Sequence, residues 1–183
     1  MTFQRPFQSE EIVKLYKAFR PHQPQEVFDC IINYYKDKHV SNPFTLAVDI
    51  GCGPGISTIP LANHFHKVIG IDISEVQISQ ANSARENVSY KVGRGEDLHF
   101  CEDESVDLVI MMAAFHWLDR ERIYNELRRV LKPNGVIAIC TYWHNFDLGH
   151  PEATKALYSE VLQFCFYLLF YIYCYVHVFC YTI

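Results

Sequence analysis

Three glycines at alternate positions mark the place where the backbone could approach a ligand most closely. Gly51, Gly53 and Gly55 follow the apolar run 46–48, which is typical of a buried strand. Glycine adopts positive φ without strain and has no side chain to hold a ligand away. A helix expected to start near Ile56 would also direct its free N–H groups toward the turn. The pattern therefore predicts a binding site at residues 51–55.

Two aspartates near this turn indicate what kind of ligand it binds. Asp72 lies 21 residues after Gly51, and an acid at about this spacing in parallel α/β sheets holds ribose hydroxyls. The dinucleotide motif G-x-G-x-x-G needs a small residue at Ile56, and Asp49 would repel a pyrophosphate but suit an ammonium group. These residues favour a nucleoside linked to an amino acid, with a dinucleotide-dependent dehydrogenase as a more distant alternative. The alternative is that these residues form no binding site: the glycines would only close a tight turn, and Asp72 would only cap the next helix.

The segments that must position these residues alternate between strand and helix patterns. Short apolar runs typical of covered parallel strands separate stretches with helical spacing of apolar residues. The alternation predicts an α/β fold, a Rossmann-like parallel sheet of about five strands with helices on both faces. The strands are expected from 46 and at 68–72, 88–93, 106–114 and 135–142, and the helices at 8–20, 25–37, 56–65, 74–86 and 119–131.

Five segments in order carry a resemblance to a known family. They resemble the motifs of class I S-adenosylmethionine-dependent methyltransferases, and they are residues 48–55, 69–74, 92–100, 105–110 and 128–135. With residues 16–21 and 114–119, the chain is most similar to the trans-aconitate methyltransferase-like small-molecule branch. The resemblance implies methyl transfer from S-adenosylmethionine to an oxygen, carboxylate or nitrogen nucleophile of a small-molecule acceptor.

The resemblance also implies which residues bind the cofactor. The glycine turn would line it, an acid before the turn would support its amino-acid end, a second acid would hold the ribose, and an acidic pair would edge the adenine. The turn consists of Gly51, Gly53 and Gly55, and the acid before it is Asp49. The acid for the ribose is Asp72, and the acidic pair is Glu96 and Asp97. Arg94 and His99 depart from the residues usual in the family at their positions.

Residues 1–45 are expected to form N-terminal lid helices over this cofactor. Tyr16 could then face the sulfonium and Arg20 could pair with the cofactor carboxylate, although core packing and a solvated charge are the open alternatives. His116 follows the fourth strand, where its ordinary pKa would suit a general base for a hydroxyl or amine. A structural histidine is the alternative, because a carboxylate acceptor needs no base. Trp117 could line the site or pack in the core.

Composition excludes several other classes of protein. The net charge of −5 and the interspersed acids and bases give no basic stripe for nucleic acid. Seven scattered cysteines without a Cys-x-x-Cys pair indicate neither a zinc site nor a disulfide framework, and they fit a reduced compartment. The N-terminus lacks the apolar core of a signal peptide. We therefore expect a cytoplasmic enzyme without a metal.

The end of the chain departs from this picture. After the core, expected at 46–150, the family continues with a helix and a two-strand antiparallel hairpin, which this sequence lacks. Residues 151–183 form a divergent hydrophobic tail instead, with no Asp, Glu, Lys or Arg from 161 to 183. The tail could be a membrane anchor, for which about 20 residues suffice; part of it could be a sheet strand; or it could arise from an alternative final exon, which we favour. The alternative function is a cofactor-binding fragment with little or no turnover, anchored to a membrane through 161–183.

Overall fold

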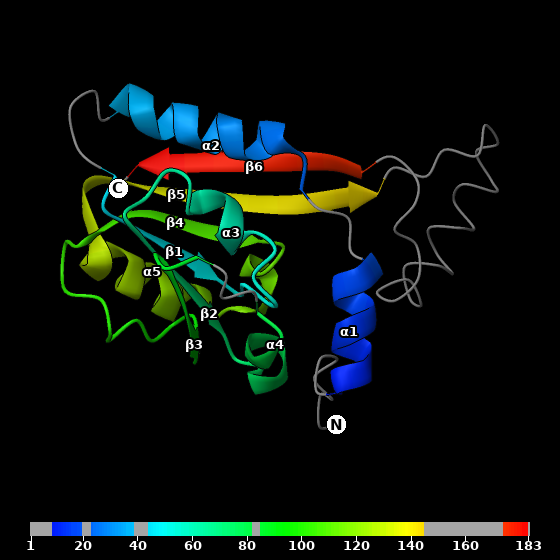
Figure 1. Cartoon of the computed structure of the whole chain (residues 1–183). Coiled ribbons are helices and arrows are strands. Elements are labelled where there is room, and N and C mark those ends of the chain that lie inside the picture. The colour runs from blue at the N-terminus through cyan, green and yellow to red at the C-terminus, as the bar shows by residue number, and fades with distance from the viewer. Residues whose placement is uncertain (1–8, 20–22, 39–43, 82–84, 145–173, 183) are drawn as a thin grey trace.

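Apolar strands build a sheet that is covered on both faces. The computed structural model describes residues 9–19, 23–38, 44–81, 85–144 and 174–182. The strands are β1 (Leu46–Ile50), β2 (Lys67–Asp72), β3 (Val88–Val92), β4 (Val106–Met112), β5 (Leu131–His144) and β6 (Cys174–Thr182). Their order is β3-β2-β1-β4-β5-β6, with the first five parallel and β6 antiparallel to β5 (Figure 1). The predicted Rossmann-like sheet of five parallel strands is confirmed.

Helices lie on both faces of this sheet, as the sequence predicted. α2 and α3 pack on one face and α5 packs on the other, so each face has its own apolar core (Figure 1). The helices are α1 (Glu10–Phe19), α2 (Gln25–Lys38), α3 (Thr58–Leu61), α4 (Glu75–Ser79), the 3₁₀ turn η1 (Phe115–Trp117) and α5 (Arg120–Val130).

The central strand β4 shows how the two cores are separated. Leu108, Ile110 and Met112 belong to the core under α2, whereas Val109 and Met111 belong to the core under α5. This alternation is the two-residue period of a strand. All seven residues of β4 are buried, as expected for a strand covered on both faces.

A buried carboxylate connects the elements at the amino-terminal ends of the strands. Asp107 is 2% exposed, and its Oδ1 accepts hydrogen bonds from the Tyr35 hydroxyl and the Lys132 ammonium, both at 2.8 Å. Its Oδ2 accepts from the backbone N–H groups of Thr45 and Leu46 at 2.9 and 2.8 Å, and from the Thr45 hydroxyl. One side chain therefore joins α2, the start of β1, β4 and β5.

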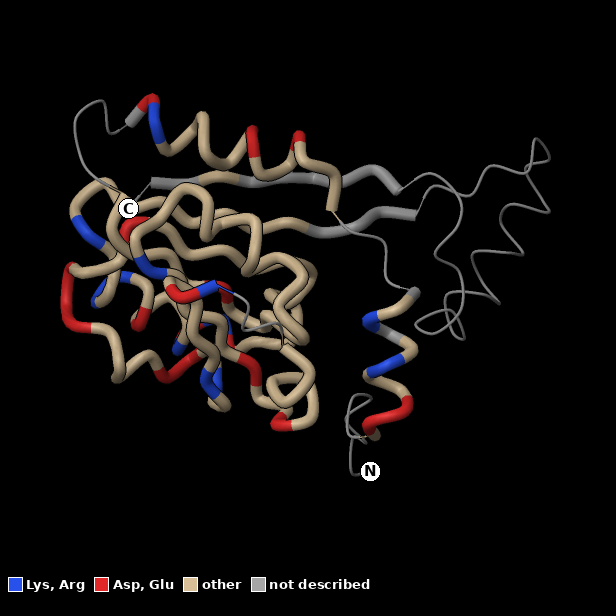
Figure 2. Tube along the Cα trace, viewed as in Figure 1, with Lys and Arg blue, Asp and Glu red and all other residues tan. Residues whose placement is uncertain are grey.

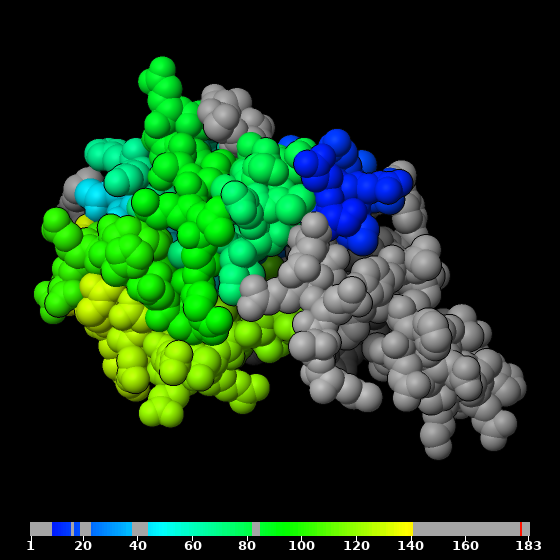
Figure 3. Space-filling model, turned by 90° about the horizontal axis from the view of Figure 1, so that it is seen from below, coloured from blue at the N-terminus to red at the C-terminus, as the bar shows by residue number. Residues whose placement is uncertain are grey.

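The short helix α1 lies apart from the sheet and against α4. Its acidic first turn, Glu10 and Glu11, and its basic last turn, Lys17, complement the helix dipole, and Figure 2 shows the two charges at opposite ends. The Lys17 ammonium donates to the carbonyl of Gln80 at 2.6 Å. In the space-filling view α1 adjoins the surface formed by α4 (Figure 3). This contact holds α1 on the side where the parallel strands end.

Two predicted helices are shorter than the sequence indicated. The helix predicted at 56–65 is α-helical only over Thr58–Leu61. Ala62, Asn63 and His64 donate to the carbonyls three residues before them, so the segment continues as tight turns. The helix predicted at 74–86 is helical over Glu75–Ser79 in the described part of the chain. By contrast, α5 starts where predicted, with Asp119 Oδ1 accepting from the N–H of Arg122 at 3.2 Å.

The tail contributes a strand to the sheet. β6 pairs with β5 from Val136 opposite Thr182 to His144 opposite Cys174. The alternative in which part of the tail forms a sheet strand is therefore confirmed for β6, and within the described residues one antiparallel strand, rather than a two-strand hairpin, lies beside β5. No helix among the described residues is long and apolar enough to cross a membrane. Residues 161–173 of the possible span lie outside the described ranges.

We expect Asp107→Asn to lower the free energy of unfolding by about 3 kcal/mol, because the change leaves the Lys132 ammonium without its counter-ion and turns an amide N–H group toward other donors. Burial alone would raise the pKa of Asp107, but hydrogen bonds from Lys132, Thr45, Leu46 and Tyr35 outweigh it and lower that pKa. The ionised form thus stabilises the fold above the unfolded pKa of about 4, and this stabilisation is lost as pH falls through the lower folded pKa.

Urea unfolding of the wild type and the variant at several pH values measures both effects. The exposed Asp29→Asn, on α2, is the matched control and should change stability by less than about 0.5 kcal/mol. Equal losses for the two variants, or a wild-type advantage that grows on acidification, would contradict the role of Asp107.

Candidate functional site

The glycine turn after β1 has a backbone that only glycine adopts readily. Gly51, Gly53 and Gly55 have φ values of 70°, 54° and 83°. The N–H groups of Gly51 and Cys52 both donate to the carbonyl of Ile71, at 2.8 and 3.1 Å. The turn is therefore bonded to the end of β2, and its conformation requires residues that tolerate positive φ.

Close packing adds a second requirement for glycine at two of these positions. A Cβ at Gly51 would overlap the Cβ of Ala114, which follows β4. A Cβ at Gly55 would lie 2.7 Å from Cζ of Tyr90, on β3. The turn is therefore held between the segment that follows β4 and the side chain of Tyr90 on β3, with no room for a side chain at Gly51 or Gly55.

Asp49, the acid before the turn, is fully buried beneath it. Its Oδ2 accepts hydrogen bonds from the hydroxyls of Ser57 and Thr58, both at 2.7 Å. These bonds fix the first residues of α3 relative to β1. Asp49 is not part of the cavity wall described below, so the structure places it as a support for the turn.

Asp72, at the end of β2, faces the turn. Its Oδ2 accepts from the N–H of Gly53 at 2.9 Å, and its Oδ1 accepts from the N–H of Ser74 at 2.8 Å. Burial raises the pKa of Asp72, although the bonds from Ser74 and Gly53 act in the opposite direction. This carboxylate is oriented by two backbone groups and still has lone pairs for a ligand.

A cavity of about 800 Å³ opens at the carboxyl ends of the parallel strands. Its wall comes from residues within 50–57, 71–77, 93–96 and 112–118, together with Gln23. Ligands of open α/β sheets bind at this edge, and the volume lies in the range of about 300–1,000 Å³ usual for small-molecule sites. The predicted glycine turn and Asp72 thus belong to one cavity.

The acidic pair predicted for the adenine divides between the cavity and the surface. Glu96 lines the cavity, its side chain is 6% exposed, and its Oε1 accepts from the N–H of Asp119 at 2.9 Å. Arg94 lies 3.4 Å from the same oxygen. Asp97 is exposed, lies outside the cavity wall and bonds to Nδ1 of His99 at 2.9 Å, and this bond from His99 lowers the pKa of Asp97.

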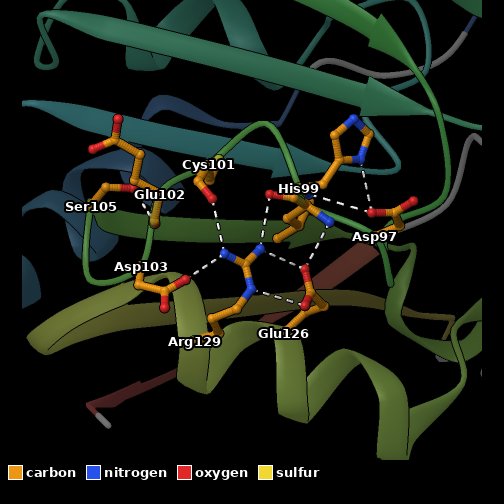
Figure 4. Close-up of polar contacts among 9 residues, drawn as sticks. Asp97, His99, Cys101, Glu102, Asp103, Ser105, Glu126 and Arg129 are labelled. Atoms are coloured by element: carbon orange, nitrogen blue, oxygen red, sulfur yellow. Dashed lines mark hydrogen bonds and ion pairs between the residues drawn. The ribbon is translucent and has the colours of Figure 1, made fainter.

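An arginine of α5 holds the loop that follows Glu96 (Figure 4). Nε and one terminal nitrogen of Arg129 bond to the carboxylate of Glu126 at 3.1 and 2.9 Å. The remaining N–H groups reach the carbonyls of Leu98 and Cys101 and the carboxylate of Asp103, at 3.1, 3.0 and 2.7 Å. Glu126 also accepts from the N–H of Leu98 at 2.9 Å. Three of the five guanidinium donors thus bond to this loop directly, and the other two bond to Glu126, which itself bonds to the loop.

The other predicted site residues lie around the cavity or outside the described atoms. Trp117 lines the cavity and is 53% exposed. His116 lies outside the wall and is largely exposed, with its ring 4.8 Å from that of Trp117, and partial desolvation of the ring lowers the pKa of His116. The side chain of Tyr16, within α1, and the whole of Arg20 lie outside the described part of the structure.

Two buried glutamines in the cavity wall escaped the sequence patterns. Gln23 and Gln77 are 8% and 4% exposed. In the sequence, the spacing of Ser74 and Gln77 is typical of a capping box, and the Ser74 hydroxyl does accept from the N–H of Gln77 at 3.3 Å. Its position five residues after Asp72 could have indicated a side chain near the turn. Gln23 follows residues 20–22, where no periodic pattern gives a signal.

Comparisons with known proteins agree with this geometry. A family model described as a methyltransferase domain matches residues 48–139. A Saccharomyces cerevisiae protein named as a probable S-adenosylmethionine-dependent methyltransferase is 32% identical over 150 residues, covering 79% of this chain and 50% of that protein. A trans-aconitate 2-methyltransferase of Variovorax paradoxus is 40% identical over 97 residues, covering 50% of this chain and 36% of that enzyme.

The fold is also similar to a solved structure. A protein from Anaeromyxobacter dehalogenans described as a putative type II methyltransferase superposes with a TM-score of 0.63 at 34% identity, covering 79% of this chain and 59% of that one. The chain spans about half the length of the curated relatives it matches.

Gly51→Ala should lower the free energy of unfolding by about 3 kcal/mol, because it combines left-handed backbone strain with the overlap on Ala114. Gly53→Ala has the same backbone strain, but its Cβ would lie 3.6 Å from Gln77, so about 1–2 kcal/mol is expected. The double variant Gly51→Ala/Ala114→Gly should recover the difference. Urea unfolding measures all three, and a double variant no more stable than Gly51→Ala would refute the overlap.

Proposed function

The chain belongs to the class I S-adenosylmethionine-dependent methyltransferases, and on that premise we propose that it transfers a methyl group from S-adenosylmethionine to a small molecule. The observation that carries the proposal is the Asp72 carboxylate, which faces the glycine turn inside a cavity at the carboxyl ends of the strands. The chain spans about half the length of these relatives, so the activity is a proposal for these 183 residues and not a property taken over from the longer proteins.

The residues of the cavity fit this cofactor. Two wall positions, Gly51 and Gly53, have positive φ and leave the backbone open to a ligand. Asp72 would accept hydrogen bonds from the ribose hydroxyls, and Glu96 would lie at the adenine edge. We propose that Asp49 acts through the turn that it supports. These assignments agree with the donor and acceptor groups of an adenosyl amino acid.

We propose supporting roles for the remaining predicted residues. Gly55 would maintain the turn above Tyr90, and Asp97 would act through the loop after Glu96. Tyr16 and Arg20 would act from the N-terminal helices 1–45, as a lid over the core. The contact of α1 with α4 beside the cavity supports this role.

Bound S-adenosylmethionine supplies a methyl group on a sulfonium, which an acceptor displaces in line. The protein would contribute position and exclusion of water. The exposed indole of Trp117 lies in the cavity wall, where its ring face would attract a cationic group. The apolar wall residues Ile50 and Leu118 would keep water from the reacting atoms.

We propose an acceptor of the kind used by the small-molecule branch. The similarity to the trans-aconitate 2-methyltransferase supports a carboxylate as the first acceptor to test. A hydroxyl or amine acceptor would require removal of a proton. Because burial lowers the pKa of His116, its imidazole is neutral near pH 7 and could accept that proton beside Trp117.

Calorimetric titration should detect binding of S-adenosylmethionine and S-adenosylhomocysteine. Asp72→Asn should weaken both by roughly 10- to 100-fold, the effect of losing hydrogen bonds to a charged acceptor. Wild-type affinity should fall as pH falls through the raised pKa of Asp72, because the protonated carboxyl accepts fewer hydrogen bonds, and the variant should lack this dependence. Asp37→Asn, at an exposed carboxylate of α2 away from the cavity, is the control. Failure of the wild type to bind either compound would refute the proposed function.

Turnover is measured as S-adenosylhomocysteine formed with trans-aconitate, a phenol and an amine. If the acceptor is a phenol or amine, His116→Asn should lower kcat by about 100-fold and remove the low-pH limb of the rate profile. The exposed His66→Asn, at the start of β2, is the matched control. An unchanged rate for His116→Asn with such an acceptor would exclude His116 as the base.

A further inference from the structure

The side chain of Gln77 has an unusual environment for a buried amide. Gln77 lies in α4, is 4% exposed and forms part of the cavity wall. Its Oε1 has no hydrogen-bond partner among the described residues. A buried acceptor without a partner costs about 1–3 kcal/mol relative to one that is bonded. The position therefore suits a ligand that brings a donor.

A neighbouring acid explains why the Gln77 side chain does not complete the cap of its own helix. In a capping box the glutamine side chain would bond back to the N–H of Ser74. Here that N–H donates to Oδ1 of Asp72 at 2.8 Å, while the Ser74 hydroxyl still accepts from the N–H of Gln77. Only one half of the box is formed. Asp72 replaces the other half and leaves the Gln77 amide available to the cavity.

The amide lies beside the glycine turn, next to Asp72. The Cβ position of Gly53 is 3.6 Å from Oε1 of Gln77 and 3.7 Å from its Nε2. The N–H of the same glycine donates to Oδ2 of Asp72. Gln77 and Asp72 therefore flank one residue of the turn. Both residues line the cavity beside this glycine.

We propose that Oε1 of Gln77 accepts a hydrogen bond from a ribose hydroxyl of the bound cofactor, so that Gln77 and Asp72 bind the ribose together. The inference rests on the proposed function, because the ribose belongs to S-adenosylmethionine. The hydroxyl supplies the donor that the buried oxygen lacks. Gln77 is thus a cofactor-binding residue as well as a residue of the helix cap.

Calorimetric titration of Gln77→Met tests this assignment, since methionine keeps the length of the side chain but has no acceptor oxygen. Binding of S-adenosylhomocysteine should weaken about tenfold. Binding of 5′-methylthioadenosine, which has the ribose but no amino-acid end, should weaken by the same factor. The thermal midpoint of the ligand-free protein should stay the same or rise, because a buried acceptor without a partner has been removed. Gln77→Leu serves as the second variant.

The matched control is Gln80→Met, at the C-cap of the same helix and outside the cavity wall. Unchanged S-adenosylhomocysteine affinity in Gln77→Met would overturn the inference. Weaker S-adenosylhomocysteine binding with unchanged 5′-methylthioadenosine binding would overturn the ribose assignment. A lower thermal midpoint together with weaker binding would reveal a structural role instead. Absence of wild-type binding would refute the proposed function, a distinct result.

Discussion

The Asp107 carboxylate is the interaction on which the arrangement of the sheet depends most. It satisfies two backbone N–H groups at the entrance to β1, a tyrosine hydroxyl of α2 and an ammonium group of β5. A buried charge is tolerated only where such partners surround it. The amino ends of β1, β4 and β5 are therefore fixed relative to one another. The positions of the strand ends at the cavity depend on this alignment.

Backbone hydrogen bonds and buried acidic side chains fix the segments that form the cavity wall. The turn is bonded to β2 through the Ile71 carbonyl, and Asp49 fixes the start of α3 below it. Arg129 bonds to the loop after Glu96 with three of its donors and to Glu126 with the other two. These contacts lie behind the surface that a ligand would touch. They give the wall residues a defined geometry without occupying the cavity.

The sequence allowed prediction of those parts that depend on local pattern. Apolar runs identified the strands, glycine spacing located the turn, and Asp119 marked the start of α5. Features that depend on contacts between distant residues were missed or misplaced. The burial of Asp49 depends on Ser57 and Thr58 folding back over it, and the missing bond from the Gln77 side chain to the helix cap depends on Asp72 accepting from the N–H of Ser74. For the tail, the sequence offered a sheet strand as one of three alternatives, and pairing with β5, which no local pattern determines, decides for it.

The late position of β6 in the chain also has a consequence for folding during synthesis. The five parallel strands are complete in sequence at residue 144, and residues 145–173 separate them from β6. Closing this long connection carries an entropic cost, and such non-local pairing forms slowly. Until β6 pairs, the backbone groups along one side of β5 are open to strands of other nascent chains. Addition of β6 is thus the step at which folding and aggregation compete.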